Sequence, residues 1–342
     1  MRLVLRHLLS PERLESKLVP FFTQVAAYIG SSPISLRFPT MDEEAEVHYY
    51  YQYHPPGVTS VIASGMSTWI GEVDECTVLK YPLEPSGDMS RLEVERKLLE
   101  IIGPHERVIG LKGFSDTGLY LERAQNGHIA NYLESANPPP TTKQRLMWCR
   151  EAAEAVAWIH SRRILHCDIH PLNILLDDDL HVKLADFQGQ HISENGEVLL
   201  DGGSAEPTRF CCPRDDIFHA DVKTDIFALG CLIYFIMLSH QVYPDIIDGE
   251  EGWREKVEDR FRRQQWPLEQ HLCSRITLKC WKKEYESAQE IVQDIKSLDN
   301  SANPVVQSLK SLLCFPIIAI RRMFRFPVLF KGWIWSIFNG SL

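Results

Sequence analysis

The spacing of apolar residues divides the chain into a strand-rich first part and a helix-rich second part. Residues 61–83 alternate apolar and polar side chains in three short runs with turn residues between them, which predicts three strands. Residues 108–127 predict two further strands and a linker. Helical spacing of apolar residues recurs over residues 89–103, where a Gly-Pro pair ends the pattern, and over residues 141–163.

A third helical segment is apolar on all sides. Residues 222–240 read VKTDIFALGCLIYFIMLSH, a composition typical of a helix buried in the middle of a protein rather than lying on its surface. Asp225 stands near its start, and a carboxylate in such a helix needs hydrogen-bonding partners because burying an unpaired charge is costly. The order of elements predicts an α+β protein with a small antiparallel sheet followed by a larger, mainly helical part.

Composition and charge exclude several classes of protein. The chain has 342 residues, 44% of them hydrophobic and 24% charged, enough for one large core or two modest lobes. Its formal net charge of −10 argues against nucleic acid as the main partner, since phosphate backbones are bound by clustered Lys and Arg. The nine cysteines contain no CxxC pair, so we expect free thiols in a reducing compartment, either cytoplasmic or nuclear, with the cytoplasm as the leading prediction. We also expect a monomer.

The two ends of the chain differ from its middle. We expect an N-terminal extension over residues 1–55, a smaller lobe over 56–125, a larger lobe over 126–298 and a hydrophobic, basic tail over 299–342. No apolar run reaches the roughly 18 uncharged residues of a membrane-spanning helix. Within the tail, residues 303–342 mix Arg and Lys with Trp and Phe, which suits either peripheral contact with a membrane or packing on the protein's own surface.

Candidate chemistry is concentrated in residues 166–188, which read HCDIHPLNILLDDDLHVKLADFQ. Asp168 lies in a loop, Asn173 follows five residues later, and Asp186 comes directly after an apolar strand pattern. Phosphoryl transfer needs one carboxylate to orient the attacking hydroxyl and further oxygen ligands to hold Mg²⁺ against the phosphates. We therefore predict that Asp168 orients the nucleophile and that Asn173 and Asp186 bind the metal.

This segment resembles the protein kinase family, whose catalytic loop reads H-R-D-x-x-x-x-N and whose metal-binding loop reads D-F-G. The resemblance covers about residues 60–297 and is closest to small stand-alone kinases of filamentous fungi. It implies a two-lobed fold, ATP and Mg²⁺ as cofactors, and a protein substrate. It also implies that Lys80, in TVLKYP, holds the α and β phosphates of ATP. Glu95 is the predicted partner of Lys80, with Glu93 as its competitor.

The same resemblance implies a set of residues around the nucleotide. Only one glycine of the family's phosphate-covering loop remains, at Gly65. A hinge over residues 122–124 would pair with adenine through its backbone, next to a gatekeeper side chain, and three apolar side chains would enclose the purine. The predicted nucleotide-binding residues are Gly65, Ile70, Val78, Lys80, Leu121, Glu122, Ala124 and Leu175.

Several positions depart from the family pattern. Cys167 replaces the arginine that grips a phosphorylated loop in many kinases, so we expect that electrostatic switch to be missing. Gln188 replaces the glycine of D-F-G and should restrict motion of this loop, unless Gly189 supplies the flexibility. The segment at 212–214 reads CPR instead of APE, and we expect Arg214 to form a buried bridge with Glu286, the family's ion pair with its ends exchanged.

His170 stands where serine/threonine kinases usually place a lysine, and we predict that it assists catalysis by donating to a phosphate. With Pro171 it also resembles aminoglycoside and choline phosphotransferases. The leading prediction is an ATP- and Mg²⁺-dependent protein serine/threonine kinase with Asp168, Lys80, Glu95 and His170 as catalytic residues. Two alternatives stay open: a pseudokinase that serves as a nucleotide-binding scaffold, and a small-molecule phosphotransferase.

Overall fold

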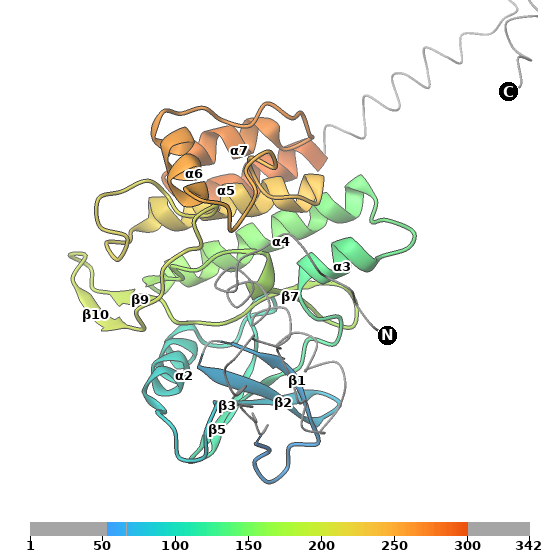
Figure 1. Cartoon of the computed structure of the whole chain (residues 1–342), viewed down its shortest axis with the longest axis vertical. Coiled ribbons are helices and arrows are strands. Elements are labelled where there is room, and N and C mark those ends of the chain that lie inside the picture. The colour runs from blue at the N-terminus through green and yellow to red at the C-terminus, as the bar shows by residue number, and fades with distance from the viewer. Residues whose placement is uncertain (1–52, 66, 300–342) are drawn as a thin grey trace, which may run out of the picture. The chain divides into compact units, whose positions relative to one another are not determined.

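A computed structural model describes residues 53–65 and 67–299, and it begins with an antiparallel sheet (Figure 1). The strands follow the order β1-β2-β3-β5-β4, and each pairs antiparallel with its neighbours. Their bounds are β1 Ser60–Ser64, β2 Thr68–Asp74, β3 Thr77–Pro82, β4 Leu111–Ser115 and β5 Gly118–Glu122. The three-strand and two-strand predictions for this part of the chain are both confirmed.

Helix α2 (Ser90–Ile102) packs against β4 and β5 of this sheet. Its predicted apolar stripe is buried, and Gly103, which adopts a φ of +70°, ends the helix. Glu95 lies within this stripe and is also buried. Strand β3 is buried along its whole length, so Lys80 on β3 and Glu95 on α2 both lie in the interior of the lobe.

The larger lobe is mainly helical. Helix α5 packs between α4 and α7, as Figure 1 shows, and is buried almost from end to end, as its apolar sequence predicts. A capping box between Asp221 and Thr224 begins α5. Gly230 of α5 lets α7 approach closely, because a Cβ there would lie 2.5 Å from the Cβ of Cys280. The helices are α3 Ile129–Ser135, α4 Thr142–Ser161, α5 Val222–Leu238, α6 Trp253–Arg262 and α7 Ser274–Trp281.

Short strands and loops between α4 and α5 carry the candidate site. One small sheet has the order β10-β9-β6, and a second consists of β7 and β8. The bounds are β6 Ile164–Leu165, the 3₁₀ helix η1 Pro171–Asn173, β7 Ile174–Leu176, β8 Val182–Leu184, β9 Gln190–Ile192 and β10 Val198–Asp201. The catalytic loop, residues 166–173, therefore joins β6 to β7, and a second loop, residues 185–189, joins β8 to β9.

The α+β class predicted from the sequence is confirmed, with an antiparallel-sheet lobe before a mainly helical lobe. The expected lobe boundary at residues 125 and 126 falls between β5 and α3. Most of the predicted extension (1–55) and tail (299–342) lies outside the described residues, and so does the membrane contact predicted for residues 303–342. Within residues 53–65 and 67–299, no helix is long and apolar enough to cross a membrane.

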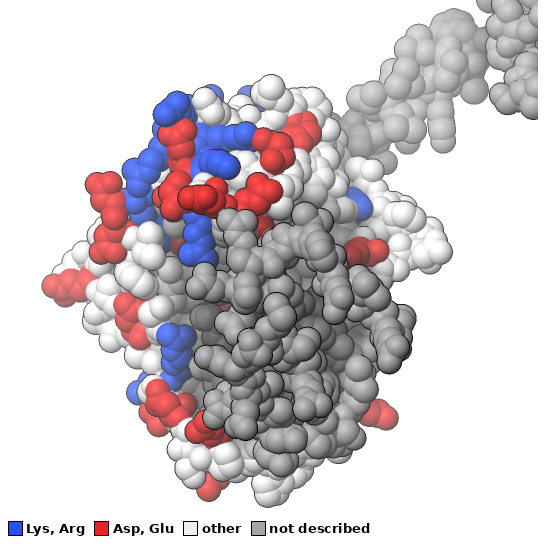
Figure 2. All heavy atoms as spheres, in the orientation of Figure 1, with Lys and Arg blue, Asp and Glu red and all other residues white. Residues whose placement is uncertain are grey.

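The described surface mixes charges of both signs. Figure 2 shows Lys and Arg side chains interspersed with Asp and Glu on the face that it draws. Arg260 pairs with Asp245 through two nitrogens, one of them 2.8 Å from a carboxylate oxygen, and Arg263 pairs with Asp259 at 2.9 Å. Such exposed pairs each contribute about 0–1 kcal/mol, so the fold depends mainly on the buried contacts described above.

Candidate active site

Lys80 lies at the centre of a buried group of charges. Its Nζ is 2.6 Å from Oε2 of Glu95 and 2.6 Å from Oδ1 of Asp186, and the Lys80 side chain is only 8% exposed. The contact between Lys80 and Glu95 predicted from the sequence is present, whereas the competitor Glu93 is exposed. Lys80 and Asp186 are 106 positions apart in the chain, and their contact links the two lobes.

Burial and charge act in opposite directions on this group. Burial alone would lower the pKa of Lys80, but the carboxylates of Glu95 and Asp186 outweigh it and raise that pKa. Burial raises the pKa of Glu95 above its usual range in spite of the Lys80 ammonium. For Asp186 burial would again raise the pKa, but Lys80 outweighs it and the pKa is lowered. Lys80 therefore stays charged and is available to an anionic ligand.

The catalytic loop holds the second predicted group. Asn173 donates from Nδ2 to the backbone carbonyl of Asp168 at 2.9 Å and to its Oδ2 at 3.2 Å. His170 Nε2 lies 3.3 Å from Oδ1 of Asp168, and its Nδ1 accepts from the amide of Leu172 at 3.3 Å. This network assigns the proton of a neutral His170 to Nε2. Asp168 is thus held in one orientation from both of its oxygens.

The two groups are connected through the backbone. The amide of Ala185, the residue before Asp186, donates to the carbonyl of Asn173 at 3.0 Å. Asp186 itself adopts a φ of +64°, a left-handed conformation that costs a residue with a side chain about 1–3 kcal/mol and is concentrated at functional sites. The catalytic loop and the 185–189 loop therefore have a fixed relation to each other.

Asp225, for which the sequence predicts hydrogen-bonding partners, is bonded to the backbone of the catalytic loop. Its Oδ2 accepts from the amide of His166 at 2.8 Å, and its Oδ1 accepts from the amide of Cys167 at 2.9 Å. His160 Nε2 lies 2.9 Å from Oδ2 of Asp225, a contact that the sequence analysis missed. His160 occurs near the end of an amphipathic helix, which gave no signal for a buried partner.

Asn173 and Asp186 fit the requirements of a magnesium ion. Asn173 uses Nδ2 for both of its bonds to Asp168, so its Oδ1 remains an acceptor without a partner among the described residues. The Asp186 side chain is 43% exposed and commits only Oδ1 to Lys80. Mg²⁺ prefers such oxygen ligands and takes the rest from phosphates and water, which agrees with a site that has one carboxylate and one amide.

The predicted nucleotide-binding residues lie on strands β2, β3, β5 and β7, in the hinge and in the turn after β1. Ile70 of β2 is paired with Lys80 of β3, and Val78 of β3 is paired with Leu121 of β5. In the hinge, the amide of Ala124 has no partner among the described residues, which leaves it available to a ligand. Leu175 is half-buried on β7 in the other lobe.

Gly65 lies in the exposed turn between β1 and β2, where its amide donates to Thr68 at 2.8 Å. A Cβ added there would meet its nearest neighbour at 3.5 Å, an ordinary contact. Neither the local space nor a positive φ therefore requires glycine at this position.

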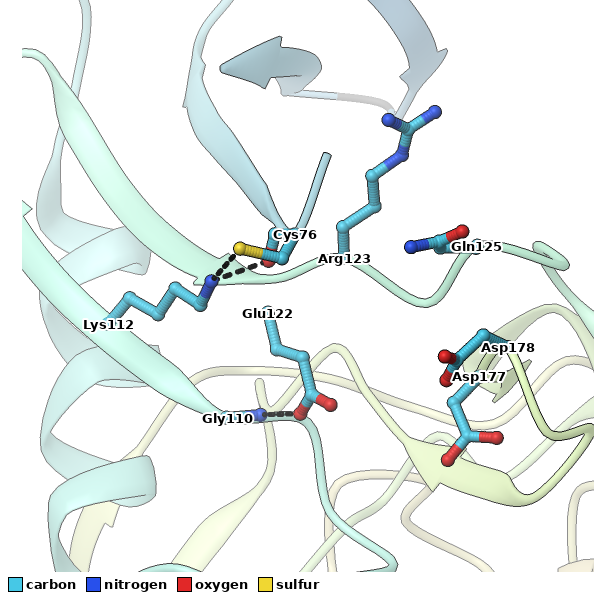
Figure 3. A pocket seen from close by; sticks show the side chains of 8 residues that line it. All are labelled: Cys76, Gly110, Lys112, Glu122, Arg123, Gln125, Asp177 and Asp178. Atoms are coloured by element: carbon cyan, nitrogen blue, oxygen red, sulfur yellow. Dashed lines mark hydrogen bonds between the residues drawn. The ribbon is translucent and has the colours of Figure 1, made fainter. Parts of the chain in front are cut away.

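The side chain of Glu122 lines a cavity at the end of strand β5. Its Oε2 accepts from the amide of Gly110 at 2.9 Å, and its Oε1 lies 2.8 Å from Nζ of Lys183. Figure 3 shows this cavity, which has a volume of about 380 Å³ and which Lys112, reaching toward Cys76, also lines. None of the predicted catalytic residues lines it, so it is distinct from the site around Lys80.

Gln188 and Gly189 are both packed closely against their surroundings. Gln188 is buried, and its Nε2 donates to Oε2 of Glu95 at 3.0 Å and to the carbonyl of Arg91 at 3.2 Å. Gly189 allows close packing, because a Cβ there would lie 2.0 Å from the carbonyl oxygen of Leu165. A side chain at position 189 would therefore collide with the backbone at the start of the catalytic loop, and a role of Gly189 in flexibility stays a prediction.

The predicted bridge between Arg214 and Glu286 is also wrong. Arg214 pairs with Glu206 at 2.6 Å, and Glu286 pairs with Lys223 at 2.6 Å. The Glu206 side chain is fully buried and lies on the same segment as Arg214, so this carboxylate needs the guanidinium most. Glu286 is 80% exposed, and water stabilises its charge without a buried partner.

Comparison with known proteins gives a family and several relatives. The protein kinase domain family matches residues 77–312. Fibroblast growth factor receptor homolog 1 of Drosophila melanogaster is 29% identical over 191 residues, which are 48% of this chain and 26% of that protein. Cytoplasmic tyrosine-protein kinase BMX of Mus musculus is 29% identical over 164 residues, 47% of this chain and 25% of that protein.

A third relative belongs to the other specificity class. Serine/threonine-protein kinase PDK1 of Cryptococcus neoformans var. grubii is 30% identical over 122 residues, 33% of this chain and 10% of that protein. The chain spans about a quarter or less of the length of each of these relatives. The family match extends over well over half of the chain, and it includes Lys80, Glu95, Asp168, Asn173 and Asp186. The chain therefore belongs to the protein kinase domain family.

Proposed function

We propose that this protein transfers the γ-phosphoryl group of ATP to a hydroxyl group of a protein substrate, with Mg²⁺ as cofactor. The observation that carries the proposal is the position of Lys80 between Glu95 and Asp186, at 2.6 Å from each carboxylate. A charged, nearly buried ammonium next to an acid with one uncommitted oxygen suits the phosphates of a metal-bound nucleotide.

Each residue of the site has a role in this proposal. Lys80 binds the phosphates, and Glu95 orients Lys80. Asp168 accepts the proton of the attacking hydroxyl and directs the hydroxyl oxygen toward the phosphorus. Asn173 and Asp186 would hold Mg²⁺, which would supply positive charge to offset the negative charge that develops during transfer. Asp168 is suited to its role because His170 and Asn173 fix its carboxylate before the substrate arrives.

We propose serine and threonine as the acceptor residues. His170 supports this choice, because it places a nitrogen donor two residues after Asp168, where serine/threonine kinases usually have a lysine. The relatives include both tyrosine and serine/threonine kinases, so phosphoamino-acid analysis is the direct test. A generic basic protein should acquire phosphoserine or phosphothreonine, and transfer confined to tyrosine would overturn this part of the proposal.

A turnover assay with labelled ATP tests the proposal as a whole. We expect the intact chain to phosphorylate a generic protein substrate when Mg²⁺ is present and to stop when it is chelated. Asp168→Asn and Asp186→Asn should each lower the rate about 10³-fold, the size of effect seen when a group that stabilises the transition state is removed. Asp179→Asn, an exposed acid in the turn between β7 and β8, is the matched control and should keep the wild-type rate.

The turn at Gly65 favours a second candidate, a nucleotide-binding scaffold without transfer activity. Only one glycine of the phosphate-covering loop is left, and glycines at the other two positions would let backbone amides approach the phosphates more closely. Mg²⁺-dependent binding of ATP without transfer to any substrate would establish the scaffold. Transfer to an aminoglycoside or to choline, and none to protein, would instead establish the small-molecule phosphotransferase that His170 and Pro171 suggest.

A further inference from the structure

Gln188 connects the 185–189 loop to helix α2 through its side chain. It stands two residues after Asp186 and is 8% exposed. Its Nε2 donates to Oε2 of Glu95 at 3.0 Å and to the carbonyl of Arg91, one turn earlier in α2, at 3.2 Å. Both hydrogens of one amide group are therefore used to hold the same helix.

The chemistry of the partners fixes the orientation of this amide. The Arg91 carbonyl accepts only, and the Glu95 carboxylate accepts in its ionised form, so the NH₂ end must face them. The Gln188 Oε1 is buried and has no partner among the described residues. Burying an unpaired acceptor costs free energy, so packing alone would favour an apolar side chain at this position. The two hydrogen bonds of the NH₂ group explain the glutamine better.

The backbone of Gln188 is held as firmly as its side chain. Its carbonyl accepts from the amide of Ser204 at 3.2 Å. Gly202 lies so close that a Cβ on it would be 2.3 Å from the same carbonyl oxygen. The amide of Phe187 also donates to Oε1 of Glu95, at 3.3 Å. The bond from Gln188 to Glu95 is thus anchored at both ends.

We propose that Gln188 is a positioning residue of the phosphoryl-transfer site, whose side-chain amide holds α2 so that Glu95 stays against Lys80. Where the family has a glycine that leaves the loop free to move, this chain has a side chain that is hydrogen-bonded to helix α2. Glu95 then receives donors from Lys80 and from Gln188 on the same oxygen. The kinetic part of this inference rests on the proposed function, and its structural part does not.

The experiment compares Gln188→Met with Gln190→Met in the intact chain. Methionine keeps the volume and removes the amide. Gln190 is an equally buried glutamine two residues later, and its Nε2 donates to Asp201 at 3.0 Å and to the carbonyl of Phe218 at 3.3 Å without touching α2. Both variants lose a buried amide, and only one of them loses the contact with Glu95.

Hydrogen exchange of residues 90–102 is the first readout, and it needs no catalytic activity. We expect exchange in α2 about tenfold faster in Gln188→Met, the loss expected for one hydrogen bond to a charged group, and unchanged in Gln190→Met. Equal exchange in wild type and Gln188→Met would overturn the proposal, and so would equal acceleration in both variants. If Gln188→Met does not fold, Gln188→Asn, whose amide is one methylene too short to reach α2, should give the same acceleration.

The pH dependence of kcat/KM for ATP is the second readout. The charged groups that face Glu95 are Lys80 of β3 and Asp186 of the 185–189 loop, and the Gln188 amide adds to Lys80 in lowering the pKa of Glu95. In Gln188→Met the acid limb should therefore move to higher pH, because loss of the amide lets burial raise the pKa of Glu95 further. An unmoved limb would overturn the positioning role. If exchange in α2 is faster in Gln188→Met but the wild-type protein transfers no phosphoryl group, the contact between Gln188 and α2 is supported and the proposed function is overturned instead.

Discussion

Glu95 and Asp225 are both fully buried carboxylates, but they differ in their hydrogen-bond donors and in the direction in which their pKa is shifted. Asp225 accepts from two backbone amides of the catalytic loop and lies 2.9 Å from Nε2 of His160. Burial alone would raise the pKa of Asp225, but the bonds from His160 and His166 outweigh it and lower the pKa. Glu95 has Lys80 and Gln188 as its side-chain donors, with Asp186 nearby, and burial raises its pKa.

The difference separates a carboxylate that stabilises the fold from one that belongs to the site. The donors of Asp225 include backbone amides, which cannot turn away without unfolding the loop. The donors of Glu95 are mainly side chains, and Lys80 is shared with Asp186, whose side chain is partly exposed. We therefore expect loss of Asp225 to be felt in stability and loss of Glu95 to be felt in turnover.

The largest expected effect is on stability, from Asp225→Ala. The change leaves the amides of His166 and Cys167 buried without a partner, so the free energy of unfolding should fall by about 3 kcal/mol or more. Urea denaturation measures it. Asp221→Ala is the matched control, because Asp221 caps the same helix and its loss should cost about 1 kcal/mol. Equal losses in the two variants would remove the special position of Asp225.

Glu95→Gln should give the reverse result. We expect turnover of ATP to fall about 10²-fold, because a displaced Lys80 no longer meets the phosphates in the right place. The free energy of unfolding should stay within about 1 kcal/mol of wild type, since the introduced amide would still be a polar partner for the buried donors. Glu93→Gln, an exposed change on the same helix, should alter neither quantity. A loss of stability in Glu95→Gln as large as that in Asp225→Ala would contradict the comparison.

The smallest effect is in the pH dependence of stability, and its sign differs between the two residues. The pKa of Asp225 is lowered from 3.8, so its contribution is present above pH 3.8 and is lost as the pH falls through the folded-state value. The pKa of Glu95 is raised from 4.5, so its contribution is present below pH 4.5 and is lost as the pH rises through the folded-state value. Either slope is at most about 1.4 kcal/mol per pH unit.

Urea denaturation between pH 3 and pH 7 separates the two contributions. The stability of wild type relative to Asp225→Asn should shrink as the pH falls below 3.8. The stability of Glu95→Gln relative to wild type should grow as the pH rises above 4.5. Parallel curves for both variants would show that the two carboxylates have the same surroundings after all.

The sequence predicted those contacts for which a regular element supplied a constraint. Glu95 could be preferred over Glu93 because helical spacing places it before Leu98 and Leu99, within the apolar stripe that α2 buries. Asp225 could be identified because an acid within an apolar helix needs a partner. The order of strands and the position of the catalytic loop followed from periodicity and from the resemblance to kinases.

Contacts made by irregular segments could not be predicted in this way. Glu206, the partner of Arg214, lies outside any helix or strand, so no periodicity indicated that it is buried. The reach of the Gln188 amide to α2 depends on a loop conformation that single residues do not encode. Close approach at Gly189 likewise depends on the path of the catalytic loop, which the spacing of apolar residues does not determine.

If the charges around Lys80 are assembled to bind the phosphates of a nucleotide, the affinity for Mg²⁺-bound ATP should depend on Lys80. Calorimetry of the intact protein, wild type and Lys80→Met, measures this affinity. We predict binding by wild type and affinity weaker by about tenfold or more in Lys80→Met, as expected when a charge-assisted contact is lost. Equal affinity in the two proteins, or no binding by a folded wild type, would contradict the account.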